Sequence, residues 1–171
     1  MERKACFVFS ILLSVGFSIG AQECDPQVVS GLPTTVGIAD LDVQGGYAYV
    51  GCFDPGGECP VINISNPANP FVVGTFEGAP YGLTTDVKAV GDRLYVTTGD
   101  DGHLLIIDIS QPSNPETIGR FATSGSANGV ALGISNAFVA SSVGMQVVDV
   151  TNPYEPYEAA RLWKGRLTTY V

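Results

Sequence analysis

Few residues in this chain have the types and spacing that catalysis requires. The one histidine, His103, has no nucleophile or second ligand beside it in the sequence, so neither a Ser–His–acid triad nor a zinc site is indicated. We therefore predict no catalytic residue and no bound cofactor, and we interpret His103 as a strand residue that faces solvent.

Acidic residues gather in loops that also contain glycine. Asp54 lies in FDPGGE at 53–58, and Asp100 and Asp101 lie in TGDDG at 98–102. Such loops can offer carboxylate oxygens to Ca²⁺. The EF-hand spacing is absent, however, and Asp and Gly are ordinary turn residues. We interpret these segments as turns and keep a calcium site at the three acids as the weaker alternative.

Two cysteines, Cys52 and Cys59, bracket the first of these turns. Opposed positions on antiparallel strands place Cβ atoms about 4.5–5.5 Å apart, which suits a disulfide. We predict that bridge as a local staple formed in an oxidising compartment. Metal binding is the alternative, although no histidine or third nearby cysteine completes a zinc site. Cys24 is left over, either free or paired outside this chain.

The oxidising compartment is inferred from the N-terminus. Arg3 and Lys4 precede an apolar run over 5–17, and small residues follow up to Ala21. That layout is typical of a secretory signal peptide, which we assign to residues 1–21. An uncleaved anchor is the alternative. We expect a secreted, periplasmic or cell-surface protein with no membrane span after cleavage.

The chain is acidic. Its net charge is −9 over 171 residues, and removal of residues 1–21 takes away one acid and two bases and leaves −10. Phosphate neutralisation needs clustered Lys and Arg, so nucleic-acid binding is excluded.

Internal repetition is the main architectural signal. ISNPANP at 64–70, ISQPSNP at 109–115 and VTNPYEP at 150–156 recur at spacings of 45 and 41 residues. An apolar run precedes each of these segments and a short extended piece follows it. Four short strands in a period of about 40–45 residues are the signature of propeller blades.

The repeat predicts an all-β fold of β-propeller blades, each with four antiparallel strands. We place three full units at about 38–80, 81–125 and 126–165, within a repeat region that spans 22–171. In the second unit we expect strands at 85–90, 93–98, 104–109 and 116–121, with a tight turn at Gly91-Asp92. We expect the third strand of a unit to be apolar on both faces. The aromatics of the second strands should pack against the adjacent blade: Tyr49, Tyr95 and Phe138.

The units resemble the LVIVD repeat of bacterial and archaeal surface or exported proteins, which is thought to build β-propellers. The resemblance rests on LLIIDISQPSNP at 104–115 and MQVVDVTNPYEP at 145–156. The first unit departs from it by placing Asn63 where the others have Asp108 and Asp149. These acids should hydrogen-bond backbone N–H groups of the following turn, which Asn can also do. The resemblance implies a fold and little about function.

The number of blades indicates an incomplete ring. Three units are fewer than the four to eight blades that propellers use. Residues 26–32 look like an orphan outer strand, and the chain ends at Val171, about where a fourth unit should begin. We expect a fragment of a longer propeller. A homodimer that completes the ring by self-assembly is the alternative.

Two functions are compatible with these features. The leading hypothesis is a binding module that presents loops to a protein or glycan partner at the cell surface or in the periplasm. The alternative is part of a propeller hydrolase or lyase whose channel is lined by acids of the first strands. Asp86 is then the main candidate, with Asp40 or Asp42 and Asn128 nearby.

Overall fold

The computed structural model describes residues 28, 37–53, 57–79, 83–163 and 166–169. The predicted signal peptide, Cys24 and Asp54 lie outside the described residues, as do nearly all of the predicted outer strand at 26–32 and the predicted strand start at Val171. Within the described residues, no helix has the length and apolar character needed to cross a membrane.

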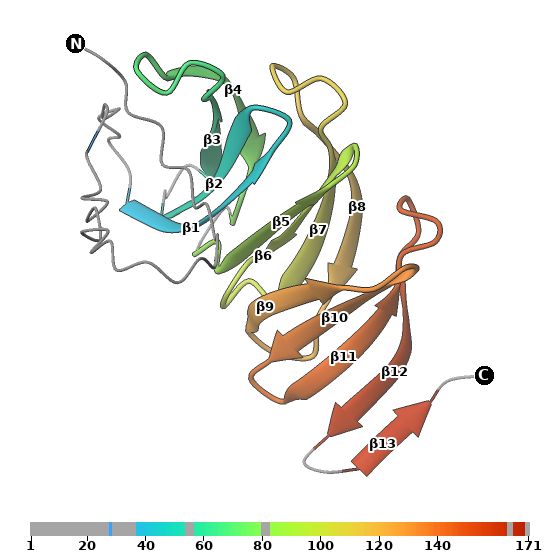
Figure 1. The fold of residues 1–171 in the computed structure, drawn as a ribbon. Coiled ribbons are helices and arrows are strands. Elements are labelled where there is room, and N and C mark those ends of the chain that lie inside the picture. The colour runs from blue at the N-terminus through green and yellow to red at the C-terminus, as the bar shows by residue number, and fades with distance from the viewer. Residues whose placement is uncertain (1–27, 29–36, 54–56, 80–82, 164–165, 170–171) are drawn as a thin grey trace, which may run out of the picture.

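The described residues form three antiparallel sheets that follow one another along the chain (Figure 1). The first sheet contains β1 (Gly37–Gln44), β2 (Tyr47–Phe53), β3 (Glu58–Asn63) and β4 (Phe71–Glu77). The second contains β5 (Asp86–Val90), β6 (Arg93–Thr97), β7 (His103–Asp108) and β8 (Glu116–Ala122). The third contains β9 (Ala127–Leu132), β10 (Asn136–Ser141), β11 (Gly144–Asp149), β12 (Tyr157–Trp163) and β13 (Arg166–Thr169).

These sheets confirm the predicted all-β fold and its three four-stranded units. Each sheet is a meander, in which neighbours in the chain are neighbours in the sheet. The strand β13 was not predicted; it pairs with β12 from Trp163↔Arg166 to Ala160↔Thr169 and adds a fifth strand. The three sheets form an open array, and the described residues do not close a ring (Figure 1).

Glycines permit the tight hairpins between the first and second strands. Gly45 and Gly46 have φ of 59° and 81°, and Gly91 has φ of 59°, a region that L side chains rarely adopt. In the second sheet Val90 pairs with Arg93 across a two-residue turn, as the Gly91-Asp92 pair predicts.

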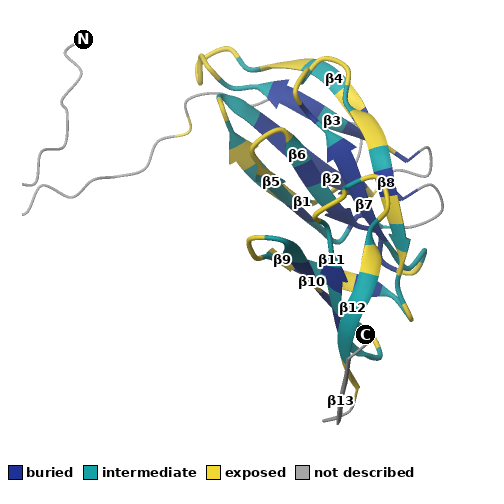
Figure 2. Cartoon of the chain, turned by 90° about the vertical axis from the view of Figure 1, so that its right-hand side faces the viewer, coloured by how far each residue is buried: buried dark blue, intermediate teal, exposed yellow. Residues whose placement is uncertain are grey.

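The hydrophobic core lies between the sheets, and the inner strands β2, β3, β6 and β7 carry most of it (Figure 2). The apolar run from Leu104 to Ile107 is fully buried, because the first sheet covers one face of β7 and the third sheet covers the other. The outer strands β4, β8 and β12 carry more exposed residues (Figure 2).

Among the described residues, the third sheet is covered on one face only. Burial alternates along β11, with Gln146 and Val148 buried and Met145 36% exposed. Tyr49 and Tyr95 contact the next sheet as predicted. The same prediction is wrong for Phe138, which is 36% exposed because no described segment packs on that face of β10.

Candidate functional site

The carboxylates of β1 bind backbone of the neighbouring sheet. Asp40 Oδ2 accepts a hydrogen bond from the Val87 N–H at 3.0 Å, and Asp42 Oδ2 accepts one from the Ala89 N–H at 2.8 Å. Val87 and Ala89 lie on β5, the edge strand of the second sheet, and the outward N–H groups of an edge strand have no partner in their own sheet. The two acids supply that partner and join β1 to β5.

The same arrangement recurs one repeat later. Asp86 on β5 uses Oδ2 to accept the Val130 N–H of β9 at 2.8 Å. Its Oδ1 accepts from Lys88 Nζ at 2.6 Å, and the same ammonium lies 3.6 Å from Asp40 Oδ2. We call the contacts made by Asp40, Asp42 and Asp86 the carboxylate clasps. Both carboxylate oxygens of Asp86 therefore accept hydrogen bonds.

The electrostatics of the clasps favour the ionised forms. Partial burial raises the pKa of Asp40, but hydrogen bonds from the N–H groups of Val87 and Leu41 and the nearby Lys88 ammonium lower it, and the pKa lies below its ordinary value of 3.8. Hydrogen bonding to Asp86 raises the pKa of Lys88 above its ordinary value. The Lys88 ammonium therefore forms an ion pair with both Asp40 and Asp86.

Replacing Asp86 with alanine is expected to lower the free energy of unfolding by about 1–2 kcal/mol, because the Val130 N–H loses its charged acceptor in a partly buried place. Urea denaturation measures the change. Asp92→Ala in the exposed hairpin turn removes the same charge and serves as the control. An equal loss in both variants would contradict the role of the clasp.

The acid of each turn sits at the end of the third strand. Asp108 Oδ1 accepts the Ser110 N–H at 2.8 Å, and Asp149 Oδ1 accepts the Thr151 N–H at 2.9 Å. In the first sheet, Asn63 stands where the other two sheets have an aspartate. Its Oδ1 accepts the Ser65 N–H at 3.0 Å, so it makes the same hydrogen bond. The predicted turn role is confirmed in all three sheets.

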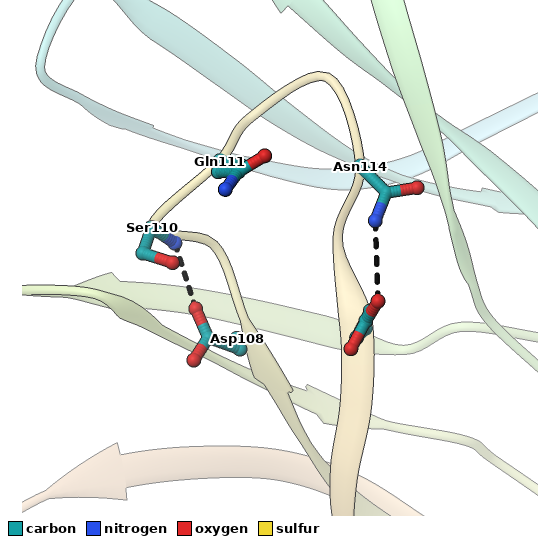
Figure 3. A pocket seen from close by; sticks show the side chains of 5 residues that line it. Asp108, Ser110, Gln111 and Asn114 are labelled. Carbon is teal, nitrogen blue, oxygen red and sulfur yellow. Dashed lines mark hydrogen bonds between the residues drawn. The ribbon is translucent and has the colours of Figure 1, made fainter.

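The turn of the second sheet also forms a small polar hollow of about 150 Å³ (Figure 3). Asp108 and Ser110 lie on one side of it, and Asn114 lies on the other, where its Nδ2 donates to Glu116 Oε1 at 3.2 Å. Gln111 completes the lining. The hollow offers carboxylate and amide oxygens to a hydroxyl or ammonium group.

The sequence comparisons fit this repeated geometry. A family profile described as the LVIVD repeat matches residues 37–77, 81–123 and 124–162. The chain belongs to the LVIVD repeat family. No curated protein matches the chain at a significant level.

A further contact between LVIVD repeats occurs at their outer strands. A Cβ on Gly74 of β4 would lie 2.8 Å from the Ser113 carbonyl oxygen of the next repeat's turn. A Cβ on Gly119 of β8 would overlap the Pro153 carbonyl oxygen of the third repeat's turn. Both glycines therefore leave room for the turn of the following repeat. On β12 the equivalent register position is occupied by Ala160.

The remaining predicted residues of the LVIVD repeats are the two cysteines, the loop acids and the histidine. Cys52 and Cys59 form a disulfide, with Cα atoms 5.5 Å apart. Asp100 accepts a hydrogen bond from Ser126 Oγ at 2.9 Å and Asp101 lies beside it in the turn, and the described residues contain no group of three potential metal ligands. His103 begins β7 and is half-buried.

Three of the acids assigned to the enzyme alternative, Asp40, Asp42 and Asp86, form the clasps. Asn128 on β9 is exposed, and the strand register places Gly129 at the position equivalent to Asp86. The sequence indicated Asp40, Asp42 and Asp86 as acids of the first strands. It did not reveal their backbone partners in the next LVIVD repeat.

Acid is expected to destabilise the protein. Besides Asp40, the pKa of Asp108 is lowered by the Ser110 N–H and that of Glu158 by the Arg161 side chain. A lowered pKa means that the unfolded chain binds protons first, so stability is complete above the ordinary carboxyl value and is lost as pH falls through the folded value. Urea midpoints should be constant above roughly pH 5 and fall below it. Midpoints that rise on acidification would contradict this.

Proposed function

We propose that this LVIVD-repeat protein is exported and acts as a binding module for a partner at the cell surface or in the periplasm. The N-terminal pattern of residues 1–21 supports export, and the disulfide between Cys52 and Cys59 suits an oxidising compartment. The acidic composition suits a soluble surface that avoids other polyanions.

The engagement of the acids is the observation that carries the binding role. Asp40, Asp42 and Asp86 accept backbone N–H groups of the next repeat, so they hold the array together and are not placed for proton transfer. The groups that remain accessible are the turn side chains around the polar hollow of Figure 3, Gln111 and Asn114 among them. Turns on a rigid array of sheets are the usual location of recognition residues.

Two measurements test the proposal. N-terminal sequencing of the chain produced from its own start codon should find cleavage after Ala21, whereas an intact N-terminus would contradict export by a cleaved signal. Fluorescently labelled chain should bind saturably to envelopes of the producing cell. Gln111→Ala with Asn114→Ala should weaken that binding while leaving the melting temperature unchanged. Linear, unsaturable uptake would contradict a binding module.

A further inference from the structure

The two interfaces between repeats differ at one corresponding position. Gln44 ends β1 and pairs with Tyr47, and Val90 ends β5 and pairs with Arg93, so the two residues are equivalent. At the first interface the Gln44 side-chain amide donates to the Gly91 carbonyl oxygen in the next sheet's hairpin turn. Tyr49, beside it, is only 2% exposed. The first interface is therefore closed at this place by a side chain of the protein itself.

The second interface is open at the same place. Val90 has no amide to donate to the next hairpin, where the Gly133 N–H donates to the Asn136 carbonyl across the turn residues Ile134 and Ser135. A hollow of about 280 Å³ lies there between the second and third sheets. Its lining includes Val90, Tyr95, Leu132, Ile134, Ser135 and Val150.

The lining determines the chemistry of an occupant. Four aliphatic side chains and one tyrosine ring line the hollow together with Gly133, Ser135 and Thr151, and none of the described residues that line it is charged. Val90 is 56% exposed and Ile134 at the rim is fully exposed, an arrangement that soluble surfaces normally avoid unless a partner covers it. The volume of about 280 Å³ lies at the lower end of the range of ligand sites, about 300–1,000 Å³, and has room for a single large side chain.

The charge at the rim of the hollow indicates which type of residue should flank the side chain that a partner inserts. Asp149 precedes Val150 in the rim segment, and hydrogen bonding from the Thr151 N–H lowers its pKa, so it is ionised at neutral pH. The chain as a whole carries a net charge of −9. Basic residues on either side of the inserted side chain would complement this surface and speed its approach.

We propose that the hollow between the second and third sheets binds one aliphatic side chain, of about the size of leucine, from an extended basic segment of a partner protein. The inference rests on the proposed binding function and names the partner class. At the first interface the Gln44 side chain occupies the equivalent place, which shows that a single side chain can fill it.

Amide chemical shifts measured by NMR on the full chain test the proposal with three peptides. The first has leucine between two lysines, the second replaces leucine with glycine, and the third replaces both lysines with glutamate. We expect the first peptide to shift the amides of Gly133, Ile134 and Ser135 and to bind at least tenfold more tightly than the other two. Equal binding of the glycine peptide, or shifts confined to other residues, would overturn the proposal. Methyl glucoside is the fourth probe, and saturation of the same amides by it would overturn the proposal in favour of a glycan.

The variant Val90→Gln tests the comparison of the two interfaces. Its amide can reach the next hairpin as Gln44 does, so we expect it to close the hollow and to weaken binding of the leucine peptide at least tenfold. Val72→Gln makes the same chemical change on exposed β4, away from the hollow, and should bind like wild type. Equal affinity of the two variants would overturn the assignment. If peptide binding fails while saturable envelope binding persists, this inference alone is wrong.

Discussion

Replacing Gly119 with alanine is expected to lower the free energy of unfolding by about 2–3 kcal/mol, because the added methyl group must displace the turn of the third repeat. A Cβ at this position overlaps the Pro153 carbonyl oxygen, which is backbone and cannot rotate away. The second and third sheets would have to separate locally, and the buried cluster around Leu104 and Val148 would loosen with them. Urea denaturation followed by circular dichroism measures the loss.

The chain supplies the matched control for this prediction. Ala160 stands at the same register position in the third sheet, where no turn of a following repeat is described. Ala160→Gly should cost only about 0.4–1 kcal/mol, the conformational effect of a more flexible unfolded chain. If Gly119→Ala costs no more than Ala160→Gly, the close approach of the turn is not what requires glycine.

Loss of the disulfide has the second largest expected effect. A bridge that closes a short loop should contribute about 2 kcal/mol by restricting the unfolded chain. Cys52 and Cys59 are almost fully buried, so both their packing and the link between β2 and β3 are involved. Reduction with dithiothreitol should lower the unfolding free energy by that amount.

The double variant Cys52→Ala with Cys59→Ala separates the bridge from the packing. Under reducing conditions it should be less stable than the wild type only by the packing of the two buried sulfur atoms, because neither protein then has a cross-link. Mass spectrometry after alkylation counts the thiols of the untreated protein. Alkylation of both cysteines without reductant, together with a stability that reductant leaves unchanged, would contradict a structural disulfide.

The local structure could be predicted from sequence because its causes are local. Three predicted features each depend on residues a few positions apart: the Gly91-Asp92 turn, the apolar run at 104–107, and the hydrogen bond that the Ser110 N–H donates to Asp108. The hydrogen bonds between repeats were not predicted, because they depend on how far one sheet is offset from the next. The sequence nevertheless contained a signal for these contacts, in the spacing of the residues that form them. Asp86 binds the N–H of Val130, 44 residues later, which is close to the repeat period.

The open hollow was missed for a related reason. The sequence placed Val90 at the end of a first strand, but only the strand register shows that Gln44 is its equivalent. The valine at this position has no amide to reach the next hairpin, so the second interface stays open where Gln44 closes the first.

Self-assembly remains a proposal, and the third repeat limits how it could occur. Its first strand has Gly129 at the clasp position and its outer strand has Ala160 at the glycine position. A further repeat could therefore not dock on this face through the two contacts that join the first three. The exposed Phe138 and Met145 would have to form a different interface.

The central claim is that the first-strand acids join the repeats through backbone N–H groups, and amide hydrogen exchange tests it most directly. In the wild type we predict slow exchange at Val87, Ala89 and Val130. In Asp86→Ala we predict exchange at least roughly tenfold faster at Val130, while Val87 and Ala89 stay protected. Fast exchange at Val130 in the wild type, or the same rate in both proteins, would contradict the account.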